Sequence, residues 1–349
     1  MDSWRTDRLA HNLARVCQLI SNPNHYLCAS LPPDSIVDSI RVFAPATVAN
    51  VACGFDIFGF AVDNPGDQIT LTFSDEPGVR INDITGDGGR LSRDASKNTA
   101  GIAIQSFLKF INRQEVGFDV VLHKKMPLGS GLGSSAASAV AGVFAANELL
   151  GRPLPTIKLL PFAMEGERFA SGSAHADNVG PSLLGGFVVI RSYHPLDVIR
   201  IDTKARLFCT LVHPDIEVNT KDARFILKNE VSLKNTITQM GNVAGLIAGL
   251  MTPDYELISR SLVDVIIEPV RAILIPEFNE AKKAARDAGA LGCSISGSGP
   301  SMFAWSRDLQ TAEKVGEAMQ QAFLSVGITS ETYVSQINQQ GPRVLTDAD

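Results

Sequence analysis

The sequence has little of what marks several classes of protein. Its five cysteines are scattered without a C-x-x-C pair, which argues against a zinc site and a disulfide framework. No apolar run reaches the roughly 20 residues that a membrane helix needs, since the longest candidate, 136–150, contains Asn147 and Glu148. A formal net charge of −6 and a pI near 5.6 leave no basic excess for nucleic acid or an anionic membrane. We therefore expect a globular protein of the reducing cytosol, with neither nucleic acid nor membrane as a partner.

The first 38 residues differ from the rest of the chain. They mix arginines with an amphipathic leucine spacing and then pass through Pro32 and Pro33. Asp2 and Asp7 fit poorly with an acid-poor transit peptide. We interpret residues 1–38 as an appended, poorly ordered extension.

From Ser39 onward the pattern predicts an α+β protein that, at 349 residues with 45% hydrophobic content, is long enough for two domains. We place the first domain at 39–205 and the second at 206–345. The first is predicted to contain strands at 39–44, 67–74, 117–125, 185–191 and 197–203 and helices at 97–112, 135–150 and 156–170. The second is predicted to contain strands at 207–213, 291–296 and 301–305 and helices at 220–228, 232–250, 253–267 and 277–288.

A glycine-serine turn at 127–135 is the most informative motif. It joins an alternating strand to an alanine-rich helix, and its three glycines let the backbone approach an anion closely. A helix that begins immediately afterwards directs free N–H groups and a positive dipole end at that anion. A flexible linker is the alternative, but linkers are not framed by a strand and a helix. The turn therefore predicts a phosphate site.

The turn matches neither of two familiar nucleotide motifs. A Walker loop needs lysine where Ser134 stands, whereas Lys124 and Lys125 lie upstream on the strand. A dinucleotide fingerprint would require glycine at 134 and an acidic residue at the end of a following strand, but 155–170 reads as helical.

Two further segments carry turn residues. In the segment 44–59, Asn50 and Asp56 lie among small and apolar residues, where polar groups need partners. The segment 294–301 is a glycine-rich turn between two strands, which by itself is equally well explained as hairpin chemistry.

Together these segments resemble the GHMP kinase superfamily, over roughly residues 39–340. The resemblance is closest to the homoserine kinases, and six ordered motifs carry it: Pro45–Asn50 with Gly54–Asp56, Gly129–Ala136, His175–Val179, Asn219–Lys221 with Arg224, Ile267–Arg271, and Ser296–Pro300. One departure is Val51–Cys53, where relatives more often show Leu-Gly-Pro.

The resemblance implies a two-domain fold, an N-terminal α/β domain with the phosphate loop and a ferredoxin-like α+β C-terminal domain. It also implies magnesium- and ATP-dependent phosphorylation of the side-chain hydroxyl of L-homoserine, in threonine biosynthesis, by a homodimer. Two alternatives stay open: a GHMP kinase for another small alcohol, such as mevalonate or a sugar, and a non-catalytic binding protein on the same fold.

The resemblance also implies roles for individual residues. It assigns ATP and phosphate to Pro127, Leu128, Gly129, Ser130, Gly131, Leu132, Gly133, Ser134 and Ser135. It assigns magnesium to Ser135 and Glu167, with Glu165 as a rival two residues away on the same helix. It assigns homoserine to Asn50, Asp56, His175, Thr220, Arg224, Arg271 and Gly297. A zwitterion suits this last set, because arginines can clamp its carboxylate while Asp56 takes its ammonium group. Arg224 also has a simpler interpretation, a solvated ion pair with Asp222.

The run 175–178 is interpreted as a turn that contributes to the substrate site. Asn178 stands where some relatives carry a general-base aspartate, and the resemblance makes it catalytic, together with Ser135 and Glu167. The identity of a base stays open, with Asp177 as the fallback, although we expect its side chain to point elsewhere. Asn98, before a predicted helix, is either an adenine contact or a plain N-cap.

Overall fold

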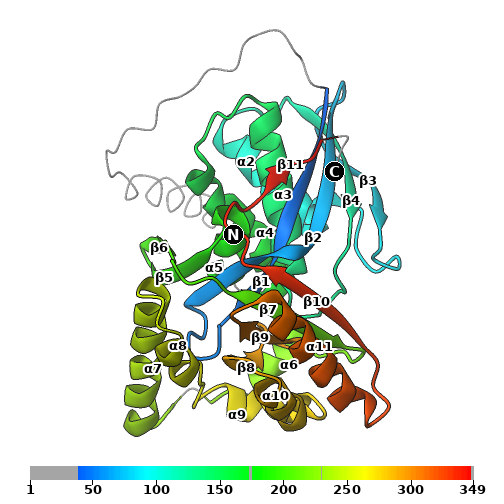
Figure 1. The fold of residues 1–349 in the computed structure, drawn as a ribbon. Helices are drawn as coiled ribbons and strands as arrows, with labels where there is room; N and C mark the ends of the chain where they lie inside the picture. The colour runs from blue at the N-terminus through cyan, green and yellow to red at the C-terminus, as the bar shows by residue number, and fades with distance from the viewer. Residues whose placement is uncertain (1–37, 173–174, 229, 347–349) are drawn as a thin grey trace.

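The computed structural model describes residues 38–172, 175–228 and 230–346 (Figure 1). The predicted extension 1–38 therefore lies outside the described residues, apart from its last one. Within the described part, no helix is long and apolar enough to cross a membrane.

The larger layer is a sheet that has seven strands in the described residues: β1 (Ser39–Ala49), β2 (Phe58–Ser74), β3 (Gly78–Thr85), β4 (Gly117–His123), β5 (Phe187–Tyr193), β6 (Leu196–Ile201) and β11 (Arg343–Val344). Five strands lie in the order β11-β1-β2-β4-β3, and the β5–β6 hairpin pairs with the beginning of β2. Only β3 and β4 run parallel among these pairs.

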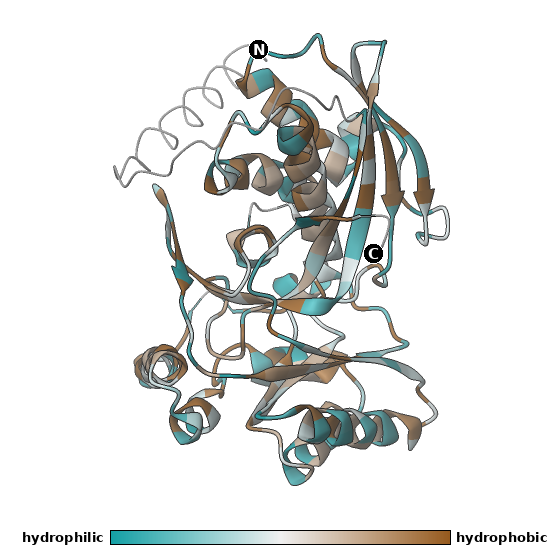
Figure 2. Cartoon of the chain, turned by 45° about the horizontal axis from the view of Figure 1, so that its top comes forward, coloured by the Kyte–Doolittle hydropathy of each residue, from teal (hydrophilic) through white to brown (hydrophobic). Residues whose placement is uncertain are grey.

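Four helices pack against this sheet and against one another: α2 (Thr99–Phe110), α3 (Ser134–Leu149), α4 (Leu160–Ser171) and α5 (Ala176–Leu184). We count them with the sheet as the larger layer. Helix α3 is apolar on all sides and most of its residues are buried, as expected for a helix inside the core. Its small side chains allow close approach, since a Cβ at Gly142 would lie 3.2 Å from the Cβ of Ala100. Figure 2 shows the apolar residues along the strands and these central helices.

The smaller layer is a four-stranded antiparallel sheet of β7 (Phe208–Pro214), β8 (Gly292–Ile295), β9 (Met302–Ser306) and β10 (Ser330–Gln336), in the order β10-β7-β9-β8. Its helices are α6 (Thr220–Phe225), α7 (Leu233–Met251), α8 (Tyr255–Ser261), α9 (Glu268–Arg271), α10 (Phe278–Asp287) and α11 (Leu309–Leu324). With α10 before β8 and α11 after β9, this strand order is ferredoxin-like. The predicted α+β class and ferredoxin-like second half are confirmed.

The two layers share a core. The Trp305 ring of β9 lies 5.3 Å from Phe60 of β2 and 5.4 Å from Phe187 of β5, between ring centroids. The chain changes sheet between β6 and β7, which supports the domain boundary that we propose near residue 206. Strand β11 is the exception, because it returns to pair with β1.

Most predicted elements lie within a few residues of an observed one, but several were missed. No strand was predicted at β3 or β10, and no helix at α11, although Asp308 caps α11 and Ala312, Val315 and Met319 give it a helical apolar spacing. The predicted helix at 253–267 is wrong in its second half, because α8 ends at Ser261 and a new helix, α9, begins at Glu268.

Candidate active site

A pocket of about 580 Å³ lies between the two layers and gathers nearly all the predicted site residues. Those that line it are Asn50, Asp56, Asn98, Leu128, Gly129, Ser130, Gly131, Gly133, Ser134, Ser135, Glu167, His175, Asn178, Thr220, Arg224, Arg271 and Gly297. Two predicted members of the phosphate loop do not. Pro127 lies before the pocket-lining part of the loop, and Leu132 is fully buried, with its carbonyl accepting the Thr47 N–H.

The glycine loop is shaped by positive φ angles and, at Gly131 and Gly133, by close contacts that leave no room for a side chain. Gly129, Gly131 and Gly133 all have positive φ, between 70° and 78°. A Cβ at Gly131 would lie 2.4 Å from the Ser296 carbonyl oxygen, and one at Gly133 only 2.1 Å from Thr47 Oγ1. The 296–301 turn thus supports the loop: Ser296 Oγ donates to the Gly131 carbonyl at 2.8 Å, and the Ser301 N–H donates to the Ser130 carbonyl.

The loop passes directly into α3. The N-cap, Gly133, has no side chain to bond the first N–H groups of the helix. Unsatisfied N–H groups at the start of a buried helix form a ready anion site. This arrangement suits a phosphate group in the pocket.

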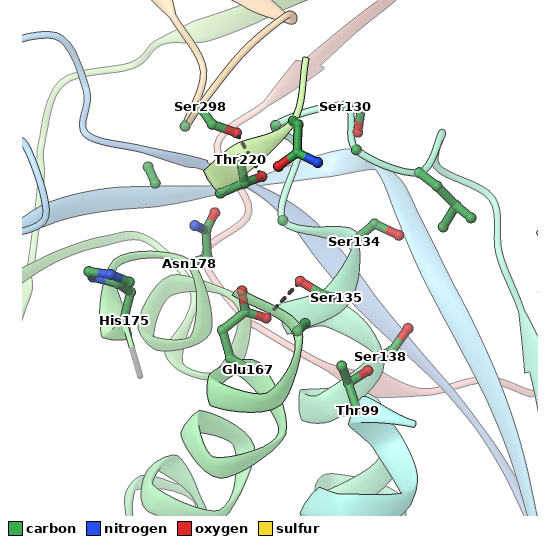
Figure 3. Close-up of a pocket in the computed structure, with 18 of the residues that line it drawn as sticks. Thr99, Ser130, Ser134, Ser135, Ser138, Glu167, His175, Asn178, Thr220 and Ser298 are labelled. Carbon is green, nitrogen blue, oxygen red and sulfur yellow. Dashed lines mark hydrogen bonds between the residues drawn. The ribbon is translucent and has the colours of Figure 1, made fainter. Parts of the chain in front are cut away.

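The two adjacent serines point in different directions. Ser134 Oγ donates to Asp67 Oδ2 at 2.8 Å, so its hydroxyl is turned to the buried side. Ser134 still lines the pocket, and its role as a phosphate ligand stays a prediction. Its backbone N–H remains in the first turn of α3. The Ser135 hydroxyl instead donates to Glu167 Oε2 at 2.6 Å, as Figure 3 shows.

A buried ion pair lies beneath this helix start. Lys124 Nζ bonds Asp67 Oδ2 and also donates to the Ser134 carbonyl at 2.9 Å and to Ser138 Oγ at 2.7 Å. The other oxygen of Asp67 accepts the N–H groups of Lys125 and Met126. The sequence showed Lys124 only as a residue upstream of the loop, whereas the structure places it under the first turn of α3.

Glu167 meets the pocket with a largely buried carboxylate. Burial raises its pKa to about 7, although the Ser135 hydrogen bond and the Lys124 charge oppose this shift. The rival Glu165 does not line the pocket and pairs instead with Arg168, 3.4 Å away.

A hydroxyl and a carboxylate facing phosphate-sized space form the oxygen donor set that Mg²⁺ uses. No cluster of three or more His, Cys, Asp or Glu side chains suited to a metal occurs in the described parts of the chain. The protein here offers only part of a coordination shell, which fits a metal whose other ligands are phosphate oxygens and waters.

The pocket is also lined by charged groups. Arg224 makes a two-pronged pair with Asp56, with N···O distances of 3.1 and 2.6 Å, so the predicted alternative of an Arg224–Asp222 pair is wrong. The Phe55 ring lies near two guanidinium groups, with its centroid 5.5 Å from that of Arg224 and 5.1 Å from that of Arg271.

Arg271 is buried without an ion-pair partner among the described carboxylates. Its Nε donates to the Ala223 carbonyl and its terminal NH1 to the Gly297 carbonyl, both at 3.0 Å. Asn50 Nδ2 donates to the same Gly297 oxygen at 2.8 Å. Burial lowers the pKa of Arg271. A buried, unneutralised guanidinium beside a pocket favours an anionic ligand.

His175 is the N-cap of helix α5 and residues 176–178 form its first turn, so the interpretation of 175–178 as a turn between elements is wrong. Asn178 Oδ1 accepts the Thr47 hydroxyl at 2.8 Å. His175 Nδ1 lies 3.6 Å from Asp56 Oδ1, and burial lowers the pKa of this imidazole, which favours its neutral form. Its Nε2 is buried with no hydrogen-bond partner among the described residues.

Two other residues complete the lining. Asn98 caps α2, with Oδ1 accepting the Ala100 N–H at 3.1 Å, and it lines the pocket as well, so its contact with adenine stays a prediction. Thr220 Oγ1 lies 3.2 Å from Ser298 Oγ, and Figure 3 shows the hydrogen bond between these two hydroxyls.

Asp177 was expected to point elsewhere, but it lines the pocket and is buried. Burial raises its pKa to about 7, and the charges of Asp56 and Glu167 add to the shift. Its Oδ1 has no hydrogen-bond partner in the described residues. The sequence signal, an aspartate in the first turn of a helix, is ordinary and gave no reason to expect burial.

The raised pKa of Asp177 predicts a pH-dependent stability. The unfolded carboxyl ionises near pH 4, so between about pH 4 and pH 7 the folded chain holds a proton that the unfolded chain has lost, and stability falls as pH rises through this window. We therefore expect the difference in melting temperature between Asp177→Asn and the parent to change with pH. It should favour the variant by roughly 2–4 °C or more at pH 8 compared with pH 4.5. Scanning calorimetry at both pH values measures this difference, and an equal difference at the two would contradict it.

Three features line this one pocket: a glycine loop at the start of a helix, a carboxylate–hydroxyl pair and two arginines. Together they define the site of a small-molecule kinase. Models of known families agree: that of the GHMP kinase N-terminal domain matches residues 98–186, and that of the C-terminal domain matches 246–325.

Individual relatives narrow the class. The homoserine kinase of Chlorobium phaeobacteroides (strain BS1) is 54% identical over 319 residues, 88% of this chain and 99% of that protein. The crystal structure of homoserine kinase from Cytophaga hutchinsonii is 58% identical with a TM-score of 0.87, over 92% of this chain and 100% of that one. The L. major mevalonate kinase, at 16% identity and a TM-score of 0.64 over 88% of this chain and 99% of that one, shares the fold. The chain belongs to the homoserine kinases of the GHMP kinase superfamily.

Proposed function

We propose that this chain transfers the γ-phosphoryl group of ATP to the side-chain hydroxyl of L-homoserine, forming O-phospho-L-homoserine for threonine biosynthesis. The observation that carries the proposal is the layout of one pocket. The glycine loop and the Ser135–Glu167 pair line it together with the charged groups Asp56, Arg224 and Arg271. The names of the similar proteins point the same way.

The charged groups of the pocket suit a zwitterion. Arg224 and Arg271 would hold the homoserine carboxylate, and Asp56 would hold its ammonium group, which requires the present Asp56–Arg224 pair to open. Asn50, His175, Thr220 and Gly297 would complete the polar lining. The hydroxyl of homoserine would then extend toward Asn178 and the loop.

Ser135 and Glu167 would hold Mg²⁺, which when bound neutralises developing charge on the phosphate oxygens. The N–H groups of the glycine loop and the start of α3 would hold the phosphates. Phosphoryl transfer depends mainly on positioning and charge stabilisation, so a strong general base is not required. Asn178 would therefore orient the hydroxyl, with no base assigned.

The test is turnover by the purified protein with MgATP and one acceptor at a time. ADP formation with homoserine, and far less with mevalonate or galactose, is the expected result. Faster turnover of mevalonate or galactose than of homoserine would assign a different GHMP kinase activity to the enzyme. No ADP with any of the three would favour a non-catalytic binding protein.

Replacing Arg271 with alanine is expected to raise the homoserine KM about a hundredfold, because a buried carboxylate contact is lost, and to change the ATP KM by less than about threefold. Initial-rate kinetics with each substrate varied in turn measure both constants. Arg307→Ala is the matched control, since Arg307 is an exposed arginine paired with Glu256. Equal rises in the two KM values would remove Arg271 from the amino-acid site.

We also propose a homodimer and a cytosolic location, which the resemblance and the cysteine pattern suggest. The described cysteines Cys53, Cys209 and Cys293 are all free and buried. Sedimentation velocity tests the dimer.

A further inference from the structure

The turn that carries Asn50 and Asp56 has an unfavourable backbone. Asn50, Val51 and Ala52 are three successive non-glycine residues with positive φ, at 71°, 43° and 58°, and Asp56 has φ of 60°. Residues other than glycine rarely adopt positive φ, and a run of such residues persists only where surrounding contacts hold the backbone in place. This turn contains one of the charged groups proposed to bind homoserine, so what holds it also shapes that site.

Gln239 of α7 supplies such a contact. The residue is 8% exposed, and its Nε2 donates at 2.9 Å to the carbonyl of Cys53, which follows the strained run. The same Nε2 donates to Asp264 Oδ1 at 2.9 Å, and Oε1 accepts the Val265 N–H at 3.0 Å. The amide thus joins the 50–56 turn to the segment between α8 and α9.

Asp264 continues the connection to Arg271. It is 7% exposed, and its carboxylate accepts the N–H groups of Ile266 and Ile267 at 2.8 and 3.0 Å and that of Glu268 at 2.9 Å. Glu268 begins α9, and Arg271 ends it. By binding these N–H groups, Asp264 fixes where α9 starts and therefore where the guanidinium of Arg271 emerges.

We propose that Gln239 and Asp264 are positioning residues that fix the relative positions of two charged groups of the amino-acid subsite, Asp56 and Arg271. Neither residue lines the pocket, so both act through groups that do. A buried network whose donors and acceptors are all used is rigid and costly to break, which suits this role. Naming homoserine as the ligand rests on the proposed function.

Gln239→Met tests the proposal, because methionine keeps the length and approximate volume of glutamine and removes its hydrogen bonds. The homoserine KM is expected to rise about tenfold or more, and the ATP KM to stay within about twofold. The control is Asn242→Leu: Asn242 lies on the same helix and donates to the Val263 carbonyl at 2.8 Å, in the same segment, without reaching the 50–56 turn. It should leave both KM values within about twofold. Melting temperatures of all variants separate this effect from loss of fold.

Asp264→Asn is the second variant and gives the answer if Gln239→Met does not fold. It keeps the shape of the side chain but weakens the hydrogen bonds that residue 264 accepts from the N–H groups at the start of α9, and a selective rise in homoserine KM is again expected. Equal rises in both KM values, no rise, or the same selective rise in Asn242→Leu would overturn the inference. These results differ from failure of the proposed function, in which the parent protein itself makes no ADP from homoserine and both proposals fall.

Discussion

Replacing Glu167 with glutamine is expected to lower turnover about a hundredfold or more and to leave the fold intact. The amide matches the carboxylate in shape and can still bond the Ser135 hydroxyl, which lies 2.6 Å from Glu167 Oε2. It cannot supply the negative charge that we propose Mg²⁺ requires beside the phosphates. A coupled assay of ADP release, repeated over a range of magnesium concentrations, measures the loss, and circular dichroism checks the fold.

Glu165→Gln is the matched control. Glu165 lies two residues away on α4, is partly exposed and pairs with Arg168 on the surface, so its loss should change turnover less than about twofold. If Glu165→Gln lost as much turnover as Glu167→Gln, or if Glu167→Gln kept full turnover, Glu167 would not be the metal ligand.

The sequence was sufficient to predict the shape of the glycine loop because its signal is local, whereas anion binding by the loop stays a prediction. A strand, glycines that can adopt positive φ and a helix follow one another within a short stretch of sequence, and the structure has them in this order. The two adjacent serines show the limit of this reasoning. Ser134 and Ser135 are the same residue type at consecutive positions of the motif, and it is Asp67 and Glu167, far away in sequence, that bond the two hydroxyls and so decide where each points.

Long-range pairing also explains the other differences. Arg224 has an acidic neighbour two residues away in Asp222, yet it pairs with Asp56, 168 residues earlier. Neither residue carries a local signal for the other. The burial of Asp177 likewise comes from the packing of α5 against β1 and β2, which no spacing within 175–178 reveals.

Lys124 illustrates the same point for stability. In the sequence it served only to show that the loop lacks a Walker lysine. In the structure both Lys124 and Asp67 have side chains no more than 2% exposed, and their network joins β2, the end of β4 and the start of α3. The ion pair therefore fixes the position of the phosphate loop from the buried side.

Replacing Lys124 with methionine should accordingly cause the largest loss of stability. Asp67 would keep its neutral donors but lose the only cation that the described structure places against it, and an uncompensated buried charge costs about 3–5 kcal/mol. We expect the melting temperature to fall by roughly 10 °C, by scanning calorimetry. Lys125→Met, at the exposed neighbouring position, should change it by about 1 °C or less. The double variant Lys124→Met with Asp67→Asn should recover more than half of the loss, because no charge then remains buried; equal melting temperatures for the double variant and Lys124→Met would instead assign the cost to lost packing.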